Sequence, residues 1–394
     1  MNIAFYFEYQ INPERGGTER VTESLAQFFM SREHKVFYLA KVPVDGTTNK
    51  IQTFFLPDAK GFATAKNIDF VKTFIGKNNI DIIINQAGNL DDVYLFSHKS
   101  LGSDIKIITC IHFSVDYGIR YFYRSLPSLE IDLKTPQVSI KNVIKRILAP
   151  YYKIQRKRNI KKRNSFICND SDRVVLLASN YVEEIKTNTL LKSINNVSYI
   201  HNPNPYLSPT LNTKKNKEII FVGRLSAQKK PEYLLDIWDA LYEKHSDWKL
   251  TFIGDGPLKN SLMQKTKQKK MENVSFTGFT NSYPYYERAA ILCMTSLYEG
   301  LPMVILEAKL HGVIPIIYDT YSASVDLITN NETGFIISAF KKNEYVKCLS
   351  KLMDNDNLRH EMMLKSYEDS KRFDIKAIGQ QWESLFSELN TGRK

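Results

Sequence analysis

Two carboxylates, Glu299 and Glu307, stand eight positions apart in AILCMTSLYEGLPMVILEAKLHGVIPII, residues 290–317. Eight residues of helix would separate their side chains by about 12 Å, and a turn within the interval shortens that distance. The paired carboxylates of glycosidases stand about 5–9.5 Å apart, so the spacing disfavours hydrolysis. It favours two carboxylates that hold different hydroxyl groups of one long ligand. The alternative is a solvated glutamate on a loop and another on the exposed side of a helix.

Two cations, Arg224 and Lys229, stand five positions apart in Gly-Arg-Leu-Ser-Ala-Gln-Lys, residues 223–229. The apolar run at 218–222 predicts a strand, so both cations fall on the loop that follows it. An arginine offers a planar fork and a lysine a movable point charge, and together they can converge on a diphosphate. Surface cations without a ligand are the alternative.

Three further residues are candidates because of where the predicted strands end. Gly16 and Gly17 follow the strand predicted at 2–7. Glycine allows backbone to approach a ligand, and the N-terminus of the helix behind it favours negative charge. His112 follows the strand predicted at 105–111, at the end where α/β sheets bind ligands. An ordinary turn and a structural histidine are the alternatives.

The elements that position the glutamates form one strand–loop–helix–strand unit. Residues 291–294 are a short apolar run typical of a buried strand. Pro302 is predicted at the first helical position, where its missing N–H costs nothing, and Gly312 ends the helix. Residues 313–317 are the next strand. The N–H groups of residues 301–304 would face an anion or a sugar oxygen at the start of that helix.

The motif S-x-x-E-G-L-P-x-x-x-L-E-A, followed by G-V-I-P-I, resembles the signature of family 4 of the glycosyltransferases. These are retaining enzymes of the GT-B fold that use nucleotide sugars. Residues 16–20, G-G-T-E-R, resemble the family's N-terminal glycine loop, and Cys-Ile-His at 110–112 stands where the family has T-x-H. The 223–229 motif resembles the family's diphosphate loop, with one departure: Lys230 stands where glycine is usual.

The resemblance implies an α/β fold of the GT-B type, with two Rossmann-like parallel-sheet domains facing across a cleft. Strands alternate with helices on both sides of a proline- and lysine-rich stretch near 201–217, which reads as a linker. We predict an N-terminal acceptor-side domain, 1–205, and a C-terminal nucleotide-sugar-binding domain, 206–374. A last helix at about 375–394 is expected to pack back on the first domain.

The resemblance also implies the reaction and the roles. The expected enzyme is a retaining hexosyltransferase that moves a sugar from a nucleotide diphosphate sugar to a glycan or lipid-linked glycan in surface polysaccharide synthesis. The expected donor is a UDP-sugar. Arg224 and Lys229 would stabilise the leaving diphosphate, Glu299 would hold the donor sugar, and Glu307 would accept from ribose hydroxyls. The implied catalytic residues are Glu299, Lys229, Arg224 and His112; the donor-binding residues are Gly16, Gly17, Arg224, Lys229, Phe279, Glu299, Gly300, Leu301, Met303, Val304 and Glu307.

No metal or cofactor is expected, because GT-B enzymes generally need no bound metal and the nucleotide sugar is a co-substrate. Asp170-Ser171-Asp172 resembles a DxD metal motif, but Asp172 leads straight into a predicted strand that Ser179 closes as an N-cap. A non-catalytic protein that binds nucleotide sugars or glycans on the same fold is the alternative function.

A basic segment at 141–163 accompanies a net charge of +12. It has no acidic residue, and apolar residues recur in it at helical spacing, interrupted by Pro150. Such a segment can lie on an anionic membrane, and a solvated helix face is the alternative. Nucleic acid is not expected, because no recognised binding motif accompanies the charge. The cations are Lys141, Lys145, Arg146, Lys153, Arg156, Lys157, Arg158, Lys161, Lys162 and Arg163.

Length and composition fit two globular domains. The chain has 394 residues, with ordinary hydrophobic (43%) and charged (24%) fractions. No run of eighteen apolar residues predicts a membrane span, and the N-terminus reads as a strand without a secretory signal. The four cysteines are far apart, which suits buried thiols. We therefore expect a cytoplasmic protein, with peripheral contact at the inner face of the plasma membrane through the basic segment.

Overall fold

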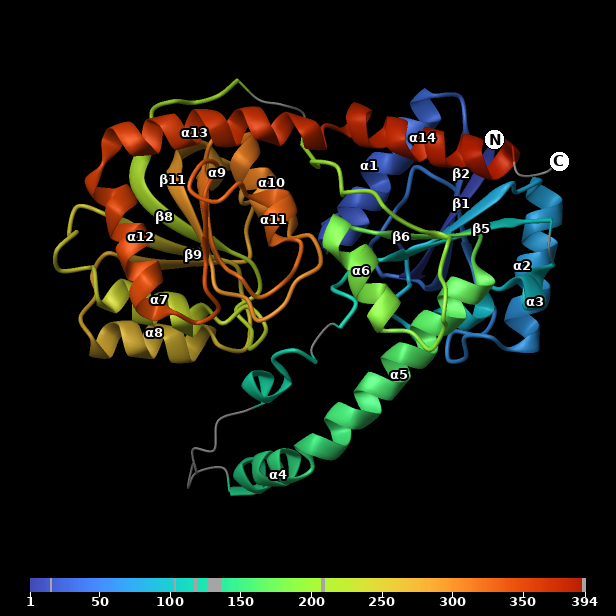
Figure 1. Ribbon diagram of the computed structural model, residues 1–394, viewed down its shortest axis with the longest axis horizontal. Coiled ribbons are helices and arrows are strands. Elements are labelled where there is room, and N and C mark those ends of the chain that lie inside the picture. Colours follow the sequence, from blue (N-terminus) through green and yellow to red (C-terminus); the bar gives the residue numbers. More distant parts are fainter. Residues whose placement is uncertain (15, 103, 117–118, 127–135, 207–209, 392–394) are drawn as a thin grey trace. The chain divides into compact units, whose positions relative to one another are not determined.

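The computed structural model describes residues 1–14, 16–102, 104–116, 119–126, 136–206 and 210–391, with backbone only for 136–141. Two compact units share these residues (Figure 1). The first unit comprises Met1–Asp116, Lys157–Pro205 and Phe373–Lys394. The second comprises Tyr117–Arg156 and Tyr206–Arg372. Residues 117–156 therefore group with the second unit, whereas the sequence-based boundary placed them in the first.

A parallel sheet of seven strands forms the centre of the first unit, in the order β3-β2-β1-β4-β5-β6-β7. All four residues of β4 are buried, as are Ile3 to Tyr6 of β1, because helices cover both faces of a parallel sheet. The strands are β1 (Asn2–Tyr9), β2 (Lys35–Val42), β3 (Thr53–Phe55), β4 (Ile82–Asn85), β5 (Lys106–Ile111), β6 (Arg173–Leu176) and β7 (Val197–Tyr199).

The last helix of the chain, α14 (Ile375–Thr391), packs on α1 (Gly17–Ser31) in the first unit (Figure 1). The rings of Phe29 and Phe386 lie 5.2 Å apart, and the absence of a side chain at Gly379 makes room for the ring of Phe28. The other helices that include residues of this unit are α2 (Ala65–Asn78), α3 (His98–Leu101), α5 (Ala149–Asp170) and α6 (Ser179–Thr187), with the 3-10 turn η1 (Asp91–Leu95).

The second unit has a parallel sheet of six strands in the order β10-β9-β8-β11-β12-β13. Its core contains two fully buried tryptophans, Trp238 and Trp248. The strands are β8 (Asn216–Val222), β9 (Lys249–Ile253), β10 (Val274–Gly278), β11 (Ala289–Met294), β12 (Ile314–Tyr318) and β13 (Phe335–Ile337). Its helices are α7 (Pro231–Asp239), α8 (Lys259–Gln268), α9 (Tyr283–Arg288), α10 (Met303–Leu310), α11 (Ser324–Leu327), α12 (Lys342–Asp354) and α13 (Asp356–Ser370).

Both sheets reverse their strand order at one point. In the first the reversal lies between β1 and β4, and in the second between β8 and β11. In open α/β sheets ligands bind at this switch point, outside the carboxyl ends of the strands, because the loops leave it in opposite directions and open a crevice. The loops after β8 and β11 are therefore the part of the second unit to examine for a site.

Part of the segment 117–156 packs on an aromatic cluster of the second unit. The ring of Tyr121 meets that of Phe340 edge-on at 5.0 Å, and the guanidinium of Arg124 lies 4.0 Å from the same ring. Arg124 also donates to the hydroxyl of Tyr233 at 3.4 Å. These contacts explain why a segment that precedes β6 belongs by its packing to the second unit. The segment contains η2 (Phe122–Ser125) and α4 (Pro136–Ile147), and it ends within α5.

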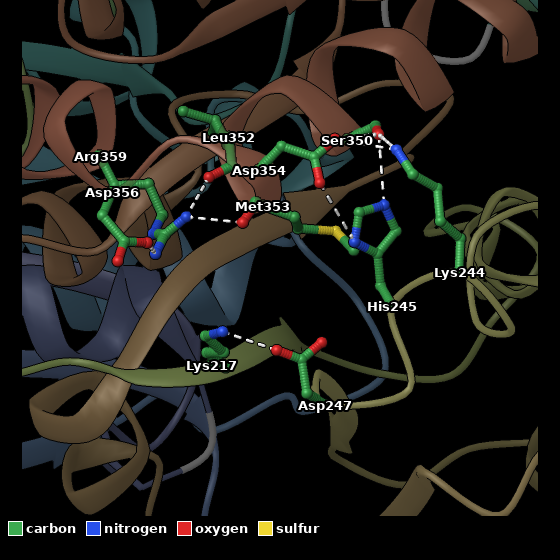
Figure 2. A network of polar contacts seen from close by, with 10 residues as sticks. All are labelled: Lys217, Lys244, His245, Asp247, Ser350, Leu352, Met353, Asp354, Asp356 and Arg359. Carbon is green, nitrogen blue, oxygen red and sulfur yellow. Dashed lines mark hydrogen bonds and ion pairs between the residues drawn. The ribbon is translucent and has the colours of Figure 1, made fainter.

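Figure 2 shows a polar corner where α12 meets α13. Arg359 donates to the carbonyls of Leu352 and Met353, which belong to the last turn of α12 and have no partner within the helix. His245 lies 3.2 Å from the Ser350 hydroxyl, and burial lowers its pKa. These contacts satisfy carbonyl groups at the end of α12, so we assign them a structural role.

The predicted α/β class, with a parallel sheet in each of two units, is confirmed, and two local predictions are wrong. Pro302 is the N-cap of α10 in extended conformation, one residue outside the helix, which begins at Met303. Ser179 is the first residue of α6, and Ala178 occupies the N-cap. Gly312 does end its helix, with φ +69°. Residues 207–209 of the predicted linker lie outside the described residues, and β8 begins at Asn216, within the predicted linker.

Replacing Gly254 by alanine should destabilise the second unit more than the same change at Gly102 destabilises the first. Both glycines have positive φ, +140° and +98°. A Cβ on Gly254 would lie 2.1 Å from the carbonyl oxygen of Gly223, whereas one on Gly102 meets nothing within 4 Å. Backbone strain costs about 1–3 kcal/mol at each position, and overpacking adds about 1–3 kcal/mol at Gly254 alone. Urea unfolding followed by tryptophan fluorescence measures the difference; equal losses would mean that these strand ends are not so close.

Candidate active site

Hydrogen bonds tie the loop after β8 to the loop after β11. The amide of Leu297 donates to the carbonyl of Gln228 at 2.8 Å, and the side chain of Gln228 donates to the carbonyl of Tyr298 at 3.0 Å. The hydroxyl of Thr295 bridges the carbonyls of Lys229 and Lys230 at 3.2 and 2.8 Å. Hydrogen bonds thus join the two loops at the switch point, and side chains on both loops are held close together.

An ion pair joins two of the predicted site residues across these loops. Lys229 Nζ lies 2.6 Å from Glu299 Oε1, and their side chains are 20% and 7% exposed. Each charge of this largely buried pair stabilises the other, because either charge alone would be costly to keep out of water. The structure therefore brings Lys229 and Glu299 together, as a shared ligand would require.

Lys230 occupies the position where the family motif usually has glycine, and its backbone has the conformation that glycine favours. Its φ and ψ are +48° and +50°, in the left-handed region. The ammonium lies 3.0 Å from Glu232 Oε1. At the position of the departure the backbone is therefore left-handed, which strains a residue other than glycine by about 1–2 kcal/mol.

The second predicted cation, Arg224, is exposed on the same loop. The loop is anchored beside it, because Leu225 donates its amide to the carbonyl of Asp255 at 2.9 Å and Gly256 packs directly against the Leu225 backbone. Arg224 thus extends from a fixed backbone into solvent, where an anionic ligand could meet it.

Glu307 lies inside the second unit. Its side chain is fully buried, and the hydroxyl of Tyr286 donates to Oε2 at 2.8 Å. One turn on, His311 Nδ1 lies 2.7 Å from the Glu307 carbonyl, and the His311 ring stacks on that of Tyr286. The structure places a carboxylate at the predicted point of α10 but covers it, so contact with a ribose stays a prediction.

The remaining predicted donor-binding residues of this unit line the start of α10, apart from one. Leu301 and Met303 are buried, at 4% and 7% exposure, and Gly300 is buried beside them. Val304 is half-buried. Phe279, by contrast, is 80% exposed after β10. A ligand that uses all of these positions would have to cover Phe279, which is the largest apolar side chain among them.

Gly16 and Gly17 begin α1 in the first unit. Gly16 is the N-cap in extended conformation, and Gly17 is the first helical residue. A Cβ on Gly16 would lie 2.7 Å from Glu19 Oε2. Glu19 thus reaches back over the helix N-terminus, as the third helical residue of a capping box does. An anion bound at this helix N-terminus would lie close to the Glu19 carboxylate.

His112 follows β5 and pairs with a residue that follows β4. Its Nε2 lies 2.5 Å from Gln86 Oε1, so Nε2 carries the proton. Burial lowers the pKa of His112 to about 4, and the imidazole is neutral at pH 7. Among the described residues, no hydrogen-bond partner reaches Nδ1. A small hollow beside His112 is lined in part by Gln86, His201 and Trp382.

The sequence did not single out several residues that support the candidates. Gln86 orients His112, Gln228 and Thr295 join the two loops, and Tyr286 covers Glu307. Gln86 could have been found, because it directly follows a buried strand that neighbours β5. The others act through contacts between segments distant in sequence. Within the described parts of the chain, no group of three His, Cys, Asp or Glu side chains could hold a metal ion.

The left-handed backbone of Lys230 predicts an unusual ranking of substitutions. Lys230→Gly should leave the free energy of unfolding within about 1 kcal/mol of wild type, because relief of strain offsets the entropy of glycine. Lys230→Val should cost about 1–3 kcal/mol, because a β-branched residue strains this region further. Lys249→Val, on the exposed start of β9, is the matched control and should change little. Urea unfolding measures these free energies. Equal stability of the Lys230→Val and Lys230→Gly variants would contradict the assigned conformation.

His112 should make the first unit less stable in acid. The unfolded chain binds the histidine proton with a pKa near 6.5, whereas the folded site binds it only near 4. Stability is therefore complete above pH 6.5 and declines as the pH falls to 4, by at most about 3 kcal/mol. His112→Gln should remove this part of the decline, and His360→Gln, an exposed histidine, should not. Urea titrations at pH 7, 5.5 and 4.5 measure it; parallel curves for wild type and His112→Gln would refute the burial of the imidazole.

The family model described as glycosyl transferases group 1 matches residues 207–369. An uncharacterized glycosyltransferase of Haemophilus influenzae is 34% identical over 194 residues, which cover 48% of this chain and 55% of that protein. The amylovoran biosynthesis glycosyltransferase AmsD of Erwinia amylovora is 26% identical over 58% of this chain and 66% of its own length. A third relative, from Campylobacter jejuni, is 30% identical over 45% and 49%; its name is GalNAc-alpha-(1->4)-GalNAc-alpha-(1->3)-diNAcBac-PP-undecaprenol alpha-1,4-N-acetyl-D-galactosaminyltransferase.

These alignments span about half to two thirds of the length of the relatives. Two solved structures share the fold along nearly the whole chain. Sucrose-phosphate synthase from Thermosynechococcus elongatus superimposes with a TM-score of 0.74 at 14% identity, over 99% of both chains. Anabaena Alr3699/HepE, in complex with UDP and glucose, gives 0.72 at 15% identity, over 98% of this chain and 100% of the other.

The matched segment contains the loop after β8, with Arg224 and Lys229. It also contains the stretch from β11 to β12, with Glu299 and Glu307. The two parallel sheets, with their strand-order reversals, agree with the fold of the solved structures. Residues 207–369 thus match the family of glycosyl transferases group 1, and the fold of the chain is GT-B.

Proposed function

We propose that this protein transfers a sugar from a nucleotide diphosphate sugar to an acceptor hydroxyl with retention of configuration. The observation that carries the proposal is the Lys229–Glu299 ion pair at the switch point of the second sheet, with Arg224 exposed on the same loop. A cation for a diphosphate and a carboxylate for a sugar hydroxyl are thereby fixed side by side. The match of residues 207–369 to the family of glycosyl transferases group 1 supports the same reaction.

Lys229 and Arg224 would act on the leaving diphosphate. As the bond between the anomeric carbon and the diphosphate oxygen breaks, negative charge grows on the phosphate, and cations held in place stabilise it without reorganisation. Lys229 is restrained by Glu299 at 2.6 Å before any ligand binds. Arg224 has no such restraint from burial, and its planar fork suits two phosphate oxygens.

Glu299 and His112 would act on the donor sugar. Glu299 can accept a hydrogen bond from a sugar hydroxyl while it keeps Lys229 in position. His112 is neutral, and Nδ1 offers a lone pair to a hydroxyl because the proton lies on Nε2. We assign no covalent nucleophile: the acceptor oxygen attacks the anomeric carbon, and the departing phosphate takes the acceptor's proton on the same face.

The finer assignments rest on relatives. UDP is the proposed nucleotide, because the Anabaena structure holds UDP and glucose, and a hexose is the proposed sugar. The name of the Campylobacter relative specifies a sugar acceptor on diphospho-undecaprenol, and that of the Erwinia relative specifies amylovoran biosynthesis. We propose a glycan or polyprenyl-linked glycan acceptor in surface polysaccharide synthesis, with residues 206–374 as the donor domain and 1–205 as the acceptor domain.

Lys229→Ala should reduce turnover about a hundredfold, because loss of one charged contact to the transition state costs about 3 kcal/mol. The change also removes the cation that faces the buried Glu299 carboxylate, which destabilises the fold. The double variant Lys229→Ala/Glu299→Gln should restore stability without restoring turnover. Lys217→Ala, which breaks an exposed ion pair at the other end of β8, is the matched control. UDP release from a panel of UDP-sugars, with thermal unfolding of each variant, is the measurement.

Two outcomes of this experiment are informative. Normal turnover of a folded Lys229→Ala variant contradicts the assigned role of the ion pair. Stabilisation by UDP without UDP release, for every sugar and acceptor offered, favours a non-catalytic binding protein. A ligand at a hundred times its dissociation constant adds about 2.7 kcal/mol, so binding is detectable by the shift in unfolding temperature.

A further inference from the structure

Helices α4 and α5 carry a surface that combines exposed apolar side chains with cations, which we call the basic amphipathic face. Its apolar part is 38–70% exposed, with Ile147 the most exposed at 70%. A folded domain normally buries such apolar side chains. A cluster of them that stays exposed indicates an interaction site. The apolar members are Val143, Ile144, Ile147, Leu148, Tyr151, Tyr152 and Ile154; the basic members are Lys157, Arg158, Lys161 and Lys162.

The two parts lie on one side of a continuous helical path. The amide of Leu148 bonds to the carbonyl of Ile144, and that of Tyr152 to the carbonyl of Leu148, so helical bonding continues across the junction at Pro150. Residues 144, 147, 151, 154, 158 and 161 follow one another at intervals of three or four. At such spacing side chains share a helix face, so the apolar stretch passes directly into the basic one.

The opposite face of α5 is the one that packs on protein. Ala149, Ile160, Asn164 and Ile167 are buried, at 0–3% exposure, and Asn164 donates to the carbonyl of Asn188. The helix is therefore fixed by one face and leaves the basic amphipathic face outward. The only acidic residue of α5 is Asp170, at its end, so no carboxylate of the helix stands within a turn of the basic members.

The chemistry of this face selects one partner among three. Duplex nucleic acid would neutralise the cations but offers no apolar environment to the isoleucines. A second copy of the chain could cover the isoleucines but would bring two sets of cations together. An anionic lipid surface satisfies both parts, because acyl chains receive the aliphatic groups, tyrosines favour the interface, and phosphate headgroups meet the lysines and arginines.

We propose that the basic amphipathic face binds the surface of an anionic phospholipid bilayer, with residues 143–154 in the interface and residues 157–162 at the headgroups. The contact would be peripheral, since none of the helices that the structure describes is long and apolar enough to span a bilayer. The inference goes beyond the proposed sugar transfer and does not depend on it.

The test is co-sedimentation of the full chain with vesicles of phosphatidylcholine, with and without 30% phosphatidylglycerol. Binding should require the anionic lipid and weaken in 0.5 M salt. Lys157→Gln/Arg158→Gln/Lys162→Gln should reduce the partition coefficient about a hundredfold, at about fivefold per cation. The matched control is Lys214→Gln/Lys267→Gln/Lys347→Gln, which removes the same charge from exposed positions elsewhere.

A second pair of variants tests the apolar part. Ile147→Ser/Ile154→Ser should reduce binding at least tenfold at low salt, whereas Leu190→Ser/Leu364→Ser, at other exposed positions, should not. All four side chains are exposed, so the folds should persist, and thermal unfolding checks this. UDP affinity, measured on the same samples, should be unchanged in every variant, which separates failure here from failure of the proposed function.

Four results would overturn the proposal: equal binding to neutral and anionic vesicles, equal loss in the lysine control, retention of binding by the isoleucine pair, or tighter binding to duplex DNA than to anionic vesicles. Sedimentation of the protein without lipid tests whether this face binds a second copy of the chain. A dimer that the isoleucine pair dissociates would assign this face to self-association and count against the bilayer.

Discussion

Two opposite charges held between adjacent strand ends are the constraint on which the candidate site depends. Lys229 leaves the loop after β8 and Glu299 the loop after β11, and the two charges meet at 2.6 Å with little solvent around the carboxylate. Neither charge could stay there alone at low cost, so each fixes the other. The hydrogen bonds from Gln228 and Thr295 then hold the backbones together, and the sheet supplies the register.

This arrangement has a consequence for any anionic ligand. A diphosphate that approaches Lys229 finds an ammonium already neutralised by a carboxylate, so the net attraction must come from Arg224 and from free backbone amides as well. In the proposed reaction, the ion pair would contribute more to the position of the ammonium than to attraction, because it would fix the ammonium where charge develops on the phosphate. Preorganised charge of this kind is worth most where water is excluded, as around the buried Glu299.

Much of the fold and part of the site could be predicted from the sequence, and the failures have a common cause. Apolar runs and glycine positions placed β1, β5, β8, β11 and α10 to within a few residues, because these signals are local. The motif also placed Lys229 and Glu299 where they could meet. The packing of residues 119–126 on Phe340 and the covering of Glu307 by Tyr286 were not predictable, because both depend on contacts between segments far apart in sequence. The N-cap of α6 is Ala178 in place of Ser179, so capping propensity alone does not locate the start of this helix.

Lys230 separates what a motif encodes in its backbone from what it encodes in its side chains. Where the family motif has glycine, this chain has a lysine, yet the backbone keeps φ +48° and ψ +50°. The position therefore specifies a left-handed turn that directs Pro231 into α7 and leaves the carbonyls of Lys229 and Lys230 facing Thr295. The hydroxyl of Thr295 and the ion pair to Glu232 offset the strain locally. A departure in sequence at this point is compatible with an intact loop, because the surrounding hydrogen bonds hold the turn in place even without the residue that adopts it most easily.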